Sequence, residues 1–278
     1  MTTDDPTKPE FASWDSYSRF AHRVRRTRRY VWTPEIQAFL DTVLATLKDR
    51  DVPIQKGAVL YRAQRGVEYV SSKDEDGEER PEEPLGYTAK RMKPREGRAS
   101  EGRANPAGIP VLYLASSEQT AISEVRPWVG SEVSVAQFKV AKSLKALGLS
   151  RGHGKSGILT LRIFSDRPYS QAEKEKAVWI DIDSAFSRPV TLSDDTADYV
   201  PTQILAELFR NAGYDAIVYR SQFGEKGYNV ALFNLEDADA VTCAPFRVTK
   251  IGVGFEQFGN KWYKSKGTAT KSKRPTDG

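Results

Sequence analysis

The sequence is poor in the residues that usually hold disulfide-linked or metal-dependent proteins together. It contains one cysteine, Cys243, which excludes an internal disulfide framework. Its two histidines, His22 and His153, are too few for a typical zinc site, so we expect no bound metal. No apolar run approaches the length of a membrane-spanning helix, and the first ten residues are too polar for a signal peptide. We therefore expect a cytoplasmic protein with no membrane partner.

Two common nucleotide-binding signatures are also missing. Residues 148–156, GLSRGHGKS, are similar to a P-loop, but that pattern requires glycine where Leu149 stands. No GxGxxG turn lies between a strand and a helix, which argues against a Rossmann site. The net charge of +5 and the pI near 9.1 nevertheless favour an anionic partner.

We expect three regions along the 278 residues, the central one bounded by the family resemblance described below. Residues 1–57 are predicted to be an N-terminal extension with a basic arm and an amphipathic helix. Residues 58–246 are predicted to form the main domain, and residues 247–278 a C-terminal segment with a lysine-rich, disordered tail. The helix is expected over residues 34–49, with Thr33 as its N-cap, Pro34 as its first residue and an apolar stripe that packs outside the sheet.

The basic arm, residues 23–29, contains the densest cluster of positive charge in the chain. One interpretation is a contact with nucleic acid. The other, which we favour, is a solvated or acid-paired arm, because only Tyr30 and Trp32 supply aromatic rings beside the arginines.

Short apolar strands alternate with capped helices, which predicts an α/β (α+β) fold with a bent, mixed sheet flanked by helices. A helix is expected from Pro201 to a glycine stop at Gly213. Residues 71–102 are strongly charged and predict a long surface loop. Strands are expected at residues 58–62, 111–114, 133–140 with one slip in alternation, 158–164, 177–182, 216–219 and 229–233, with a helical turn at 181–186.

The most informative stretch is residues 104–126, where a strand leads into a helix. Ser116 and Gln119 have the spacing of a capping box at the start of that helix. Glu124 lies at the edge of the helix's apolar face, where a carboxylate is costly unless it is paired. Spacing alone allows either a solvated helix-end glutamate or a functional carboxylate.

Three motifs in order resemble the RES domain, a family named for its arginine, glutamate and serine. The second motif includes GYDAIVYRS, which ends at Ser221, and the third motif is NVALF, which starts at Asn229. The resemblance covers residues 58–246, although Ala104 and Ala216 stand where many relatives carry an aromatic residue and a glycine. The first motif is carried by Arg103, Asn105, Gly108, Pro110, residues 112–115, Ala121 and Glu124.

This resemblance implies an ADP-ribosyltransferase-like fold and an NAD-degrading toxin. NAD would be a substrate rather than a cofactor, and water or inorganic phosphate would accept the ribosyl group. An Xre-like helix-turn-helix antitoxin is the implied partner, with a stand-alone enzyme as the alternative. The rival functions are an ADP-ribosyltransferase that modifies a macromolecule and a nucleic-acid-binding protein with an inactive RES-like domain.

The resemblance also assigns site residues. Cleavage of NAD needs positioning and charge, because nicotinamide is already a cationic leaving group: arginines can hold phosphates, tyrosines can stack on rings, and a carboxylate can stabilise the oxocarbenium-like centre. The expected catalytic residues are Arg62, Glu124 and Ser221. The expected substrate-binding residues are Tyr61, Arg103, Asn105, Tyr113 and Asn229.

Overall fold

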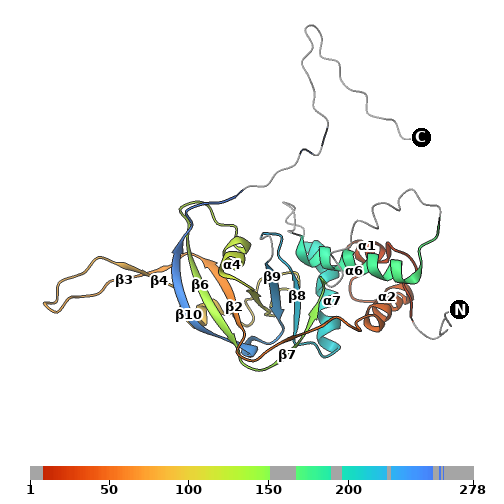
Figure 1. Cartoon of the computed structure of the whole chain (residues 1–278), viewed down its shortest axis with the longest axis horizontal. Coiled ribbons are helices and arrows are strands. Elements are labelled where there is room, and N and C mark those ends of the chain that lie inside the picture. The colour runs from red at the N-terminus through yellow and green to blue at the C-terminus, as the bar shows by residue number, and fades with distance from the viewer. Residues whose placement is uncertain are drawn as a thin grey trace, which may run out of the picture.

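The computed structural model describes residues 9–150, 167–188, 196–223, 227–252, 257 and 259. Eight strands form one sheet in the order β1-β7-β8-β9-β5-β2-β6-β10, in which β7 and β8 are parallel and the other neighbours antiparallel. Helices flank this sheet (Figure 1), so the predicted mixed α/β class is confirmed. The strands are β1 Asp51–Ile54, β2 Val59–Arg65, β5 Leu112–Ala115, β6 Glu132–Val140, β7 Leu144–Gly148, β8 Ala216–Arg220, β9 Tyr228–Leu232 and β10 Ala238–Arg247.

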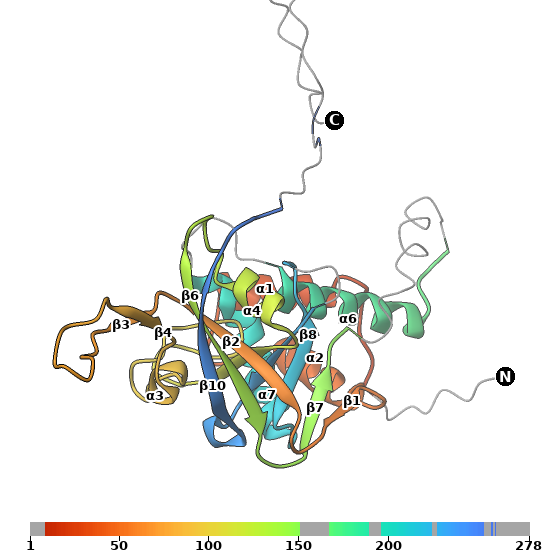
Figure 2. The same ribbon diagram turned by 60° about the vertical axis from the view of Figure 1, so that its left-hand side comes forward.

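Four of the helices gather beside one part of the sheet, and α1 and α6 lie behind it in Figure 2. They bury a cluster of aromatic and aliphatic side chains against β7, β8 and β9. A second buried cluster lies under α3 (Ala89–Met92), whose Met92 is fully buried. The four helices are α1 Ser16–Arg26, α2 Pro34–Ala45, α6 Gln171–Ser187 and α7 Val200–Asn211.

The N-terminal region is tied into this core. In α1, Tyr17, Phe20 and Val24 are buried, at the spacing of one helix face. Helix α1 was not predicted from the sequence, where the first helix was expected to begin at residue 34. Helix α2 begins at Pro34 as predicted, and β1 pairs with β7 at the sheet edge.

Helix α6 contradicts two predictions. Residues 177–182 were expected to be a strand and residues 181–186 a separate helical turn, but both lie within one helix that starts with a capping box at Ser170. Val178, Ile182 and Phe186 recur every four residues and are fully buried, which is helical rather than strand periodicity. The strand predicted at residues 158–164 lies outside the described residues.

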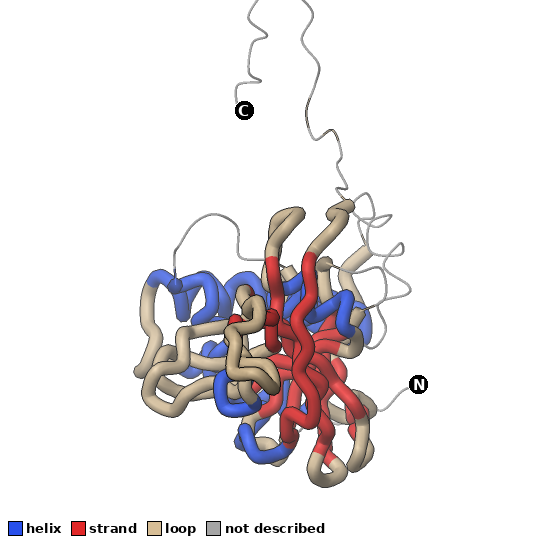
Figure 3. The backbone as a smooth tube through the Cα atoms, turned by 90° about the vertical axis from the view of Figure 1, so that its left-hand side faces the viewer, coloured by secondary structure: helices blue, strands red, loops and turns tan. Residues whose placement is uncertain are grey.

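The charged segment is more ordered than predicted. β3 (Glu68–Val70) and β4 (Glu83–Leu85) pair as a two-stranded arm that extends from the main sheet (Figures 1 and 2) and points toward the viewer in Figure 3. Residues 86–92 then return to the body, where Tyr87 is buried and its backbone N–H donates to the hydroxyl of Ser134. The prediction of a surface loop over residues 71–102 is therefore wrong for β4, Tyr87 and α3.

The strand predicted at residues 133–140 is β6. The break in alternation expected for this strand is not a bulge in β6, because the irregular pairing lies in the neighbouring strand β10. The register between β6 and β10 shifts between Ala240 and Thr242. In β6 itself, Val133 to Ala136 are all buried because both faces of this strand are covered. Two-sided burial, rather than a bulge in β6, explains the lost alternation.

The sheet opens where β2 meets β5. These two strands share a single pair of facing residues, Tyr61 and Ala115, whereas β2 pairs with β6 along its whole length. Helix α4 (Glu118–Glu124) follows β5 and packs over this opening. The described residues also form the single-turn 3₁₀ helices η2 Thr196–Tyr199, before α7, and η3 Leu235–Asp237, before β10.

Candidate active site

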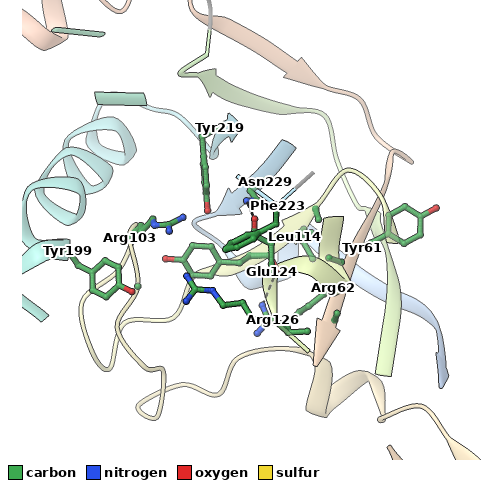
Figure 4. Close-up of a pocket in the computed structure, with 16 residues that line it drawn as sticks. Tyr61, Arg62, Arg103, Leu114, Glu124, Arg126, Tyr199, Tyr219, Phe223 and Asn229 are labelled. Carbon is green, nitrogen blue, oxygen red and sulfur yellow. Dashed lines mark hydrogen bonds between the residues drawn. The ribbon is translucent and has the colours of Figure 1, made fainter. Parts of the chain in front are cut away.

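A pocket of about 440 Å³ lies at the opening between β2 and β5, beside α4 and the ends of β8 and β9. Figure 4 shows Glu124 near its centre, with arginine and aromatic side chains around it. The lining residues most relevant to chemistry are Arg62, Arg103, Tyr113, Glu124, Arg126, Tyr199, Tyr219, Phe223 and Asn229.

Glu124 is paired with two polar side chains from distant parts of the chain. Its Oε1 accepts one hydrogen bond from the Ser221 hydroxyl at 2.7 Å and another from the Asn229 amide at 2.6 Å. Ser221 and Asn229 are buried, and Glu124 is partly exposed to the pocket. The second carboxylate oxygen accepts no hydrogen bond from the described residues. A negative charge is thus held in place with one oxygen free.

Local chemistry fixes the position of α4. The Ser117 hydroxyl, not that of Ser116, caps the helix by accepting from the Thr120 N–H at 3.1 Å. The predicted cap was therefore one residue early, because Ser116 instead uses its hydroxyl to accept from the Tyr228 N–H at 3.0 Å. Both serines can cap a helix, and only strand pairing with β9 decides which one does.

The hairpin of β8 and β9 approaches α4 closely. A Cβ atom on Gly227 would overlap the Thr120 hydroxyl, so only glycine fits at this point. The Gly227 carbonyl also accepts from the Ser221 N–H at 2.9 Å, which closes the hairpin mouth. This approach brings Ser221 and Asn229 within reach of Glu124.

Arg62 projects into the gap between β2 and β5. Its Nη1 donates to the Tyr113 carbonyl at 3.1 Å, and its buried Nε has no partner among the described residues. Burial lowers the pKa of Arg62 to about 10, because the charged form has lost water without gaining a carboxylate. Such a guanidinium is well suited to an incoming anion.

Arg103 reaches the same pocket but is already engaged. It donates to the carbonyls of Phe186 at 2.8 Å and Arg188 at 2.6 Å, at the C-terminal end of α6. A cation at this end of a helix satisfies free carbonyls and complements the helix dipole. Arg103 therefore links α6 to the pocket wall.

Asn105 and Tyr113, two of the predicted substrate-binding residues, form hydrogen bonds within the protein. Asn105 is 1% exposed and does not line the pocket. Its amide donates to the carbonyls of Ser100, Pro106 and Ile109, and its oxygen accepts from the Tyr113 hydroxyl at 2.7 Å. The expected contact of Asn105 with substrate does not fit this geometry, because its hydrogen-bonding groups are all occupied.

Tyr113 and Tyr61 differ in orientation. The Tyr113 ring lines the pocket while its hydroxyl accepts from the Ala104 N–H at 2.9 Å, and burial raises its pKa. The Tyr61 ring points away from Glu124 in Figure 4, at the edge of the lining. Of the two, Tyr113 is the one placed to contact a bound ring.

Comparison with known protein families gives a match. The model of the RES domain matches residues 79–250, more than half of the chain. The chain belongs to the RES-domain family. Arg62 and β2 lie before the matched residues, whereas Glu124, Ser221 and Asn229 lie within them.

Two other comparisons add little to the RES assignment. No curated protein sequence matches the chain. A chain in the crystal structure of the M. tuberculosis MbcT–MbcA toxin–antitoxin complex aligns with 74% of this chain and 92% of its own length. The identity between the two chains is 13% and the TM-score is 0.38.

Four residues that line the pocket of this RES domain were not predicted from the sequence: Arg126, Tyr199, Tyr219 and Phe223. Tyr199 and Tyr219 add aromatic rings, and burial raises the pKa of Tyr219 to about 12, so its hydroxyl stays protonated near neutral pH. Arg126 lies just past α4, and its guanidinium is 5.1 Å from the ring centre of Phe223. Tyr199 and Tyr219 lie in stretches that carry the resemblance, but no local signal singled out Arg126 or Phe223.

The basic arm is partly acid-paired. Arg23 contacts Glu35 at 3.1 Å and Arg25 contacts Asp198 at 3.5 Å, both within the helical layer. Arg28 and Arg29 are exposed beside Tyr30, which is 87% exposed. Among the described residues, no group of three or more histidine, cysteine, aspartate or glutamate side chains could hold a metal, and no helix is long and apolar enough to cross a membrane.

Proposed function

We propose that this RES-domain protein cleaves NAD between nicotinamide and ribose, with water or inorganic phosphate as the acceptor. The observation that carries the proposal is Glu124, fixed by Ser221 and Asn229 on one oxygen and free on the other, inside a pocket with three arginines. A fixed carboxylate beside bound cations suits a substrate that is anionic at its phosphates and cationic at its reacting ring.

The reaction needs little proton transfer. The bond between the ribosyl C1′ and the nicotinamide nitrogen breaks, and its electron pair neutralises the pyridinium ring. The acceptor oxygen then bonds to C1′, and with water as the acceptor one proton is released. The free oxygen of Glu124 would stabilise the positive charge that develops on the ribosyl ring.

The phosphates and rings of NAD also find matching groups. Arg62 has an unpartnered buried nitrogen, which an anionic oxygen would satisfy. Tyr199 and Tyr219 supply rings on the opposite side of the pocket from Arg62 (Figure 4), where an aromatic base could stack, and the Tyr113 ring also lines the pocket. No resident cofactor is required in this scheme.

The decisive experiment is incubation of purified protein with NAD, followed by chromatography of the products. We expect free nicotinamide, with ADP-ribose in phosphate-free buffer or a phosphorylated ADP-ribose when phosphate is the acceptor. Nicotinamide release only when a protein or nucleic acid is added would instead support ADP-ribosylation of a macromolecule. No release under any condition would favour an inactive domain.

We further propose that the protein acts as a toxin, with an Xre-like helix-turn-helix protein as its antitoxin. Loss of NAD would stop growth, so such an enzyme needs either an inhibitor or restricted expression. Induction of the wild type in bacteria should lower cellular NAD and slow growth, while Glu124→Gln at equal soluble level should do neither. Normal growth with unchanged NAD would count against the toxin proposal.

A further inference from the structure

The turn after α4 holds Arg126 in an unusual backbone conformation. Its φ is +46°, in the left-handed region that costs a non-glycine residue on the order of 1 kcal/mol. Arg65 of β2 supports this turn by donating from Nε to the Val125 carbonyl at 2.6 Å and from Nη2 to the Arg126 carbonyl at 3.0 Å. The conformation is thus fixed by contacts from another element.

The direction of the Arg126 side chain follows from this turn. It lines the pocket, and its guanidinium lies over the ring of Phe223, which follows β8. Figure 4 shows Arg126 and Phe223 next to Glu124. Residues from two separate loops therefore meet at the same side of the site.

Arg126 differs from the other two arginines of the pocket in its availability. Arg62 is half-buried and donates to the Tyr113 carbonyl, and Arg103 donates to two carbonyls at the end of α6. The Arg126 guanidinium is exposed and forms no hydrogen bond or ion pair with the described part of the chain. All five of its N–H donors are thus available to a ligand.

We propose that Arg126 binds a phosphate of the nucleotide substrate from the open side of the pocket, and that Arg65 is the residue that positions it. The planar guanidinium can donate two parallel hydrogen bonds to a phosphate while it remains stacked on Phe223. This inference rests on the proposed function for the identity of the substrate. It assigns a phosphate-binding role to a residue outside the motifs that carry the family resemblance.

The test compares the binding of ADP and adenosine by titration calorimetry in wild type, Arg126→Ala and Arg126→Lys. Arg126→Ala should weaken ADP about 10-fold, which corresponds to about 1.4 kcal/mol, and should leave adenosine unchanged. Arg126→Lys should recover part of the loss, because an ammonium keeps the charge but not the paired donors. Arg210→Ala, which removes an exposed arginine from the end of α7, is the matched control.

The role of Arg65 is tested by a double-mutant cycle. Arg65→Ala should also weaken ADP, but the Arg65→Ala/Arg126→Ala protein should bind ADP no more weakly than Arg126→Ala alone. A purely structural role of Arg65 would instead give additive losses, and would lower adenosine affinity as well. Additive losses would overturn the positioning role.

The failures of the two proposals can be told apart. ADP affinity within twofold of wild type in Arg126→Ala, or wild type that binds ADP no better than adenosine, would overturn the phosphate contact. Loss of ADP affinity in Arg126→Ala without any release of nicotinamide from NAD by wild type would keep this contact and reject the proposed reaction.

Discussion

The Ser221 hydroxyl donates a 2.7 Å hydrogen bond to Oε1 of Glu124, across 97 residues of sequence. Asn229 donates to the same oxygen from the next strand of the hairpin. One oxygen of the carboxylate is therefore oriented by the protein, and the other faces the pocket. The first two predictions follow from this division.

Glu124→Gln should reduce turnover of NAD by roughly 100-fold or more, about 2.7 kcal/mol of transition-state stabilisation. The amide oxygen can still accept from Ser221 and Asn229, so NAD should bind with nearly unchanged affinity. Steady-state kinetics and titration with NAD measure the two effects. Glu118→Gln, which changes the same residue type in the first turn of α4, is the control, and near-normal turnover in Glu124→Gln would reject the proposed mechanism.

Ser221→Ala should lower kcat by roughly 10-fold, because it removes one of two hydrogen bonds that orient Glu124. If Ser221 acts only through that carboxylate, Ser221→Ala in the Glu124→Gln background should cause little further loss. The kcat values of the four proteins give this coupling. Fully multiplicative losses would mean that Ser221 contacts the substrate independently of Glu124.

Arg62→Met should be at least as stable as wild type at pH 7, with a gain on the order of 1–2 kcal/mol. The folded-state pKa of Arg62, about 10, lies below its ordinary value, so the charged form is destabilised by folding. This destabilisation of the folded protein by the charged guanidinium is fully present below pH 10 and disappears as pH rises from about 10 toward 12.5. Urea unfolding measures the change, and destabilisation by more than about 1 kcal/mol would contradict it.

The same Arg62→Met protein should bind NAD much more weakly, because the buried guanidinium nitrogen is lost as a partner for phosphate. Arg62→Lys should restore part of the affinity, since an ammonium cannot form paired hydrogen bonds. A gain in stability together with a loss of affinity is the signature of a functional buried charge. Unchanged NAD affinity in Arg62→Met would remove Arg62 from the site.

Asn105→Ala should destabilise the fold by roughly 2–4 kcal/mol, because it leaves three backbone carbonyls without their side-chain donor and the Tyr113 hydroxyl without its acceptor. The remaining folded protein should bind ADP with wild-type affinity, since Asn105 lies outside the pocket lining. Urea unfolding and titration with ADP separate the two effects. Asn211→Ala, at the exposed end of α7, controls for loss of an asparagine.

The sequence by itself determined the elements that depend on neighbouring residues. The helix that starts at Pro34, the helix that stops at Gly213 and the hairpin of β8 and β9 follow from caps, apolar periodicity and turn residues a few positions apart. Part of α6 was wrongly predicted to be a strand. The prediction considered only the short apolar run there and not the four-residue spacing of its buried side chains. Motifs also singled out Glu124, Ser221 and Asn229 before any geometry was known.

Only the tertiary structure decided how these side chains are used. Asn105 contacts Tyr113 and three carbonyls that all lie nearby in the sequence, but the residue pattern does not tell whether an asparagine in such a turn points to a ligand or closes the turn. Arg126 is directed into the pocket by Arg65, 61 residues earlier. The contact between Arg65 and Arg126 arises from packing over a long chain distance, which local periodicity does not encode.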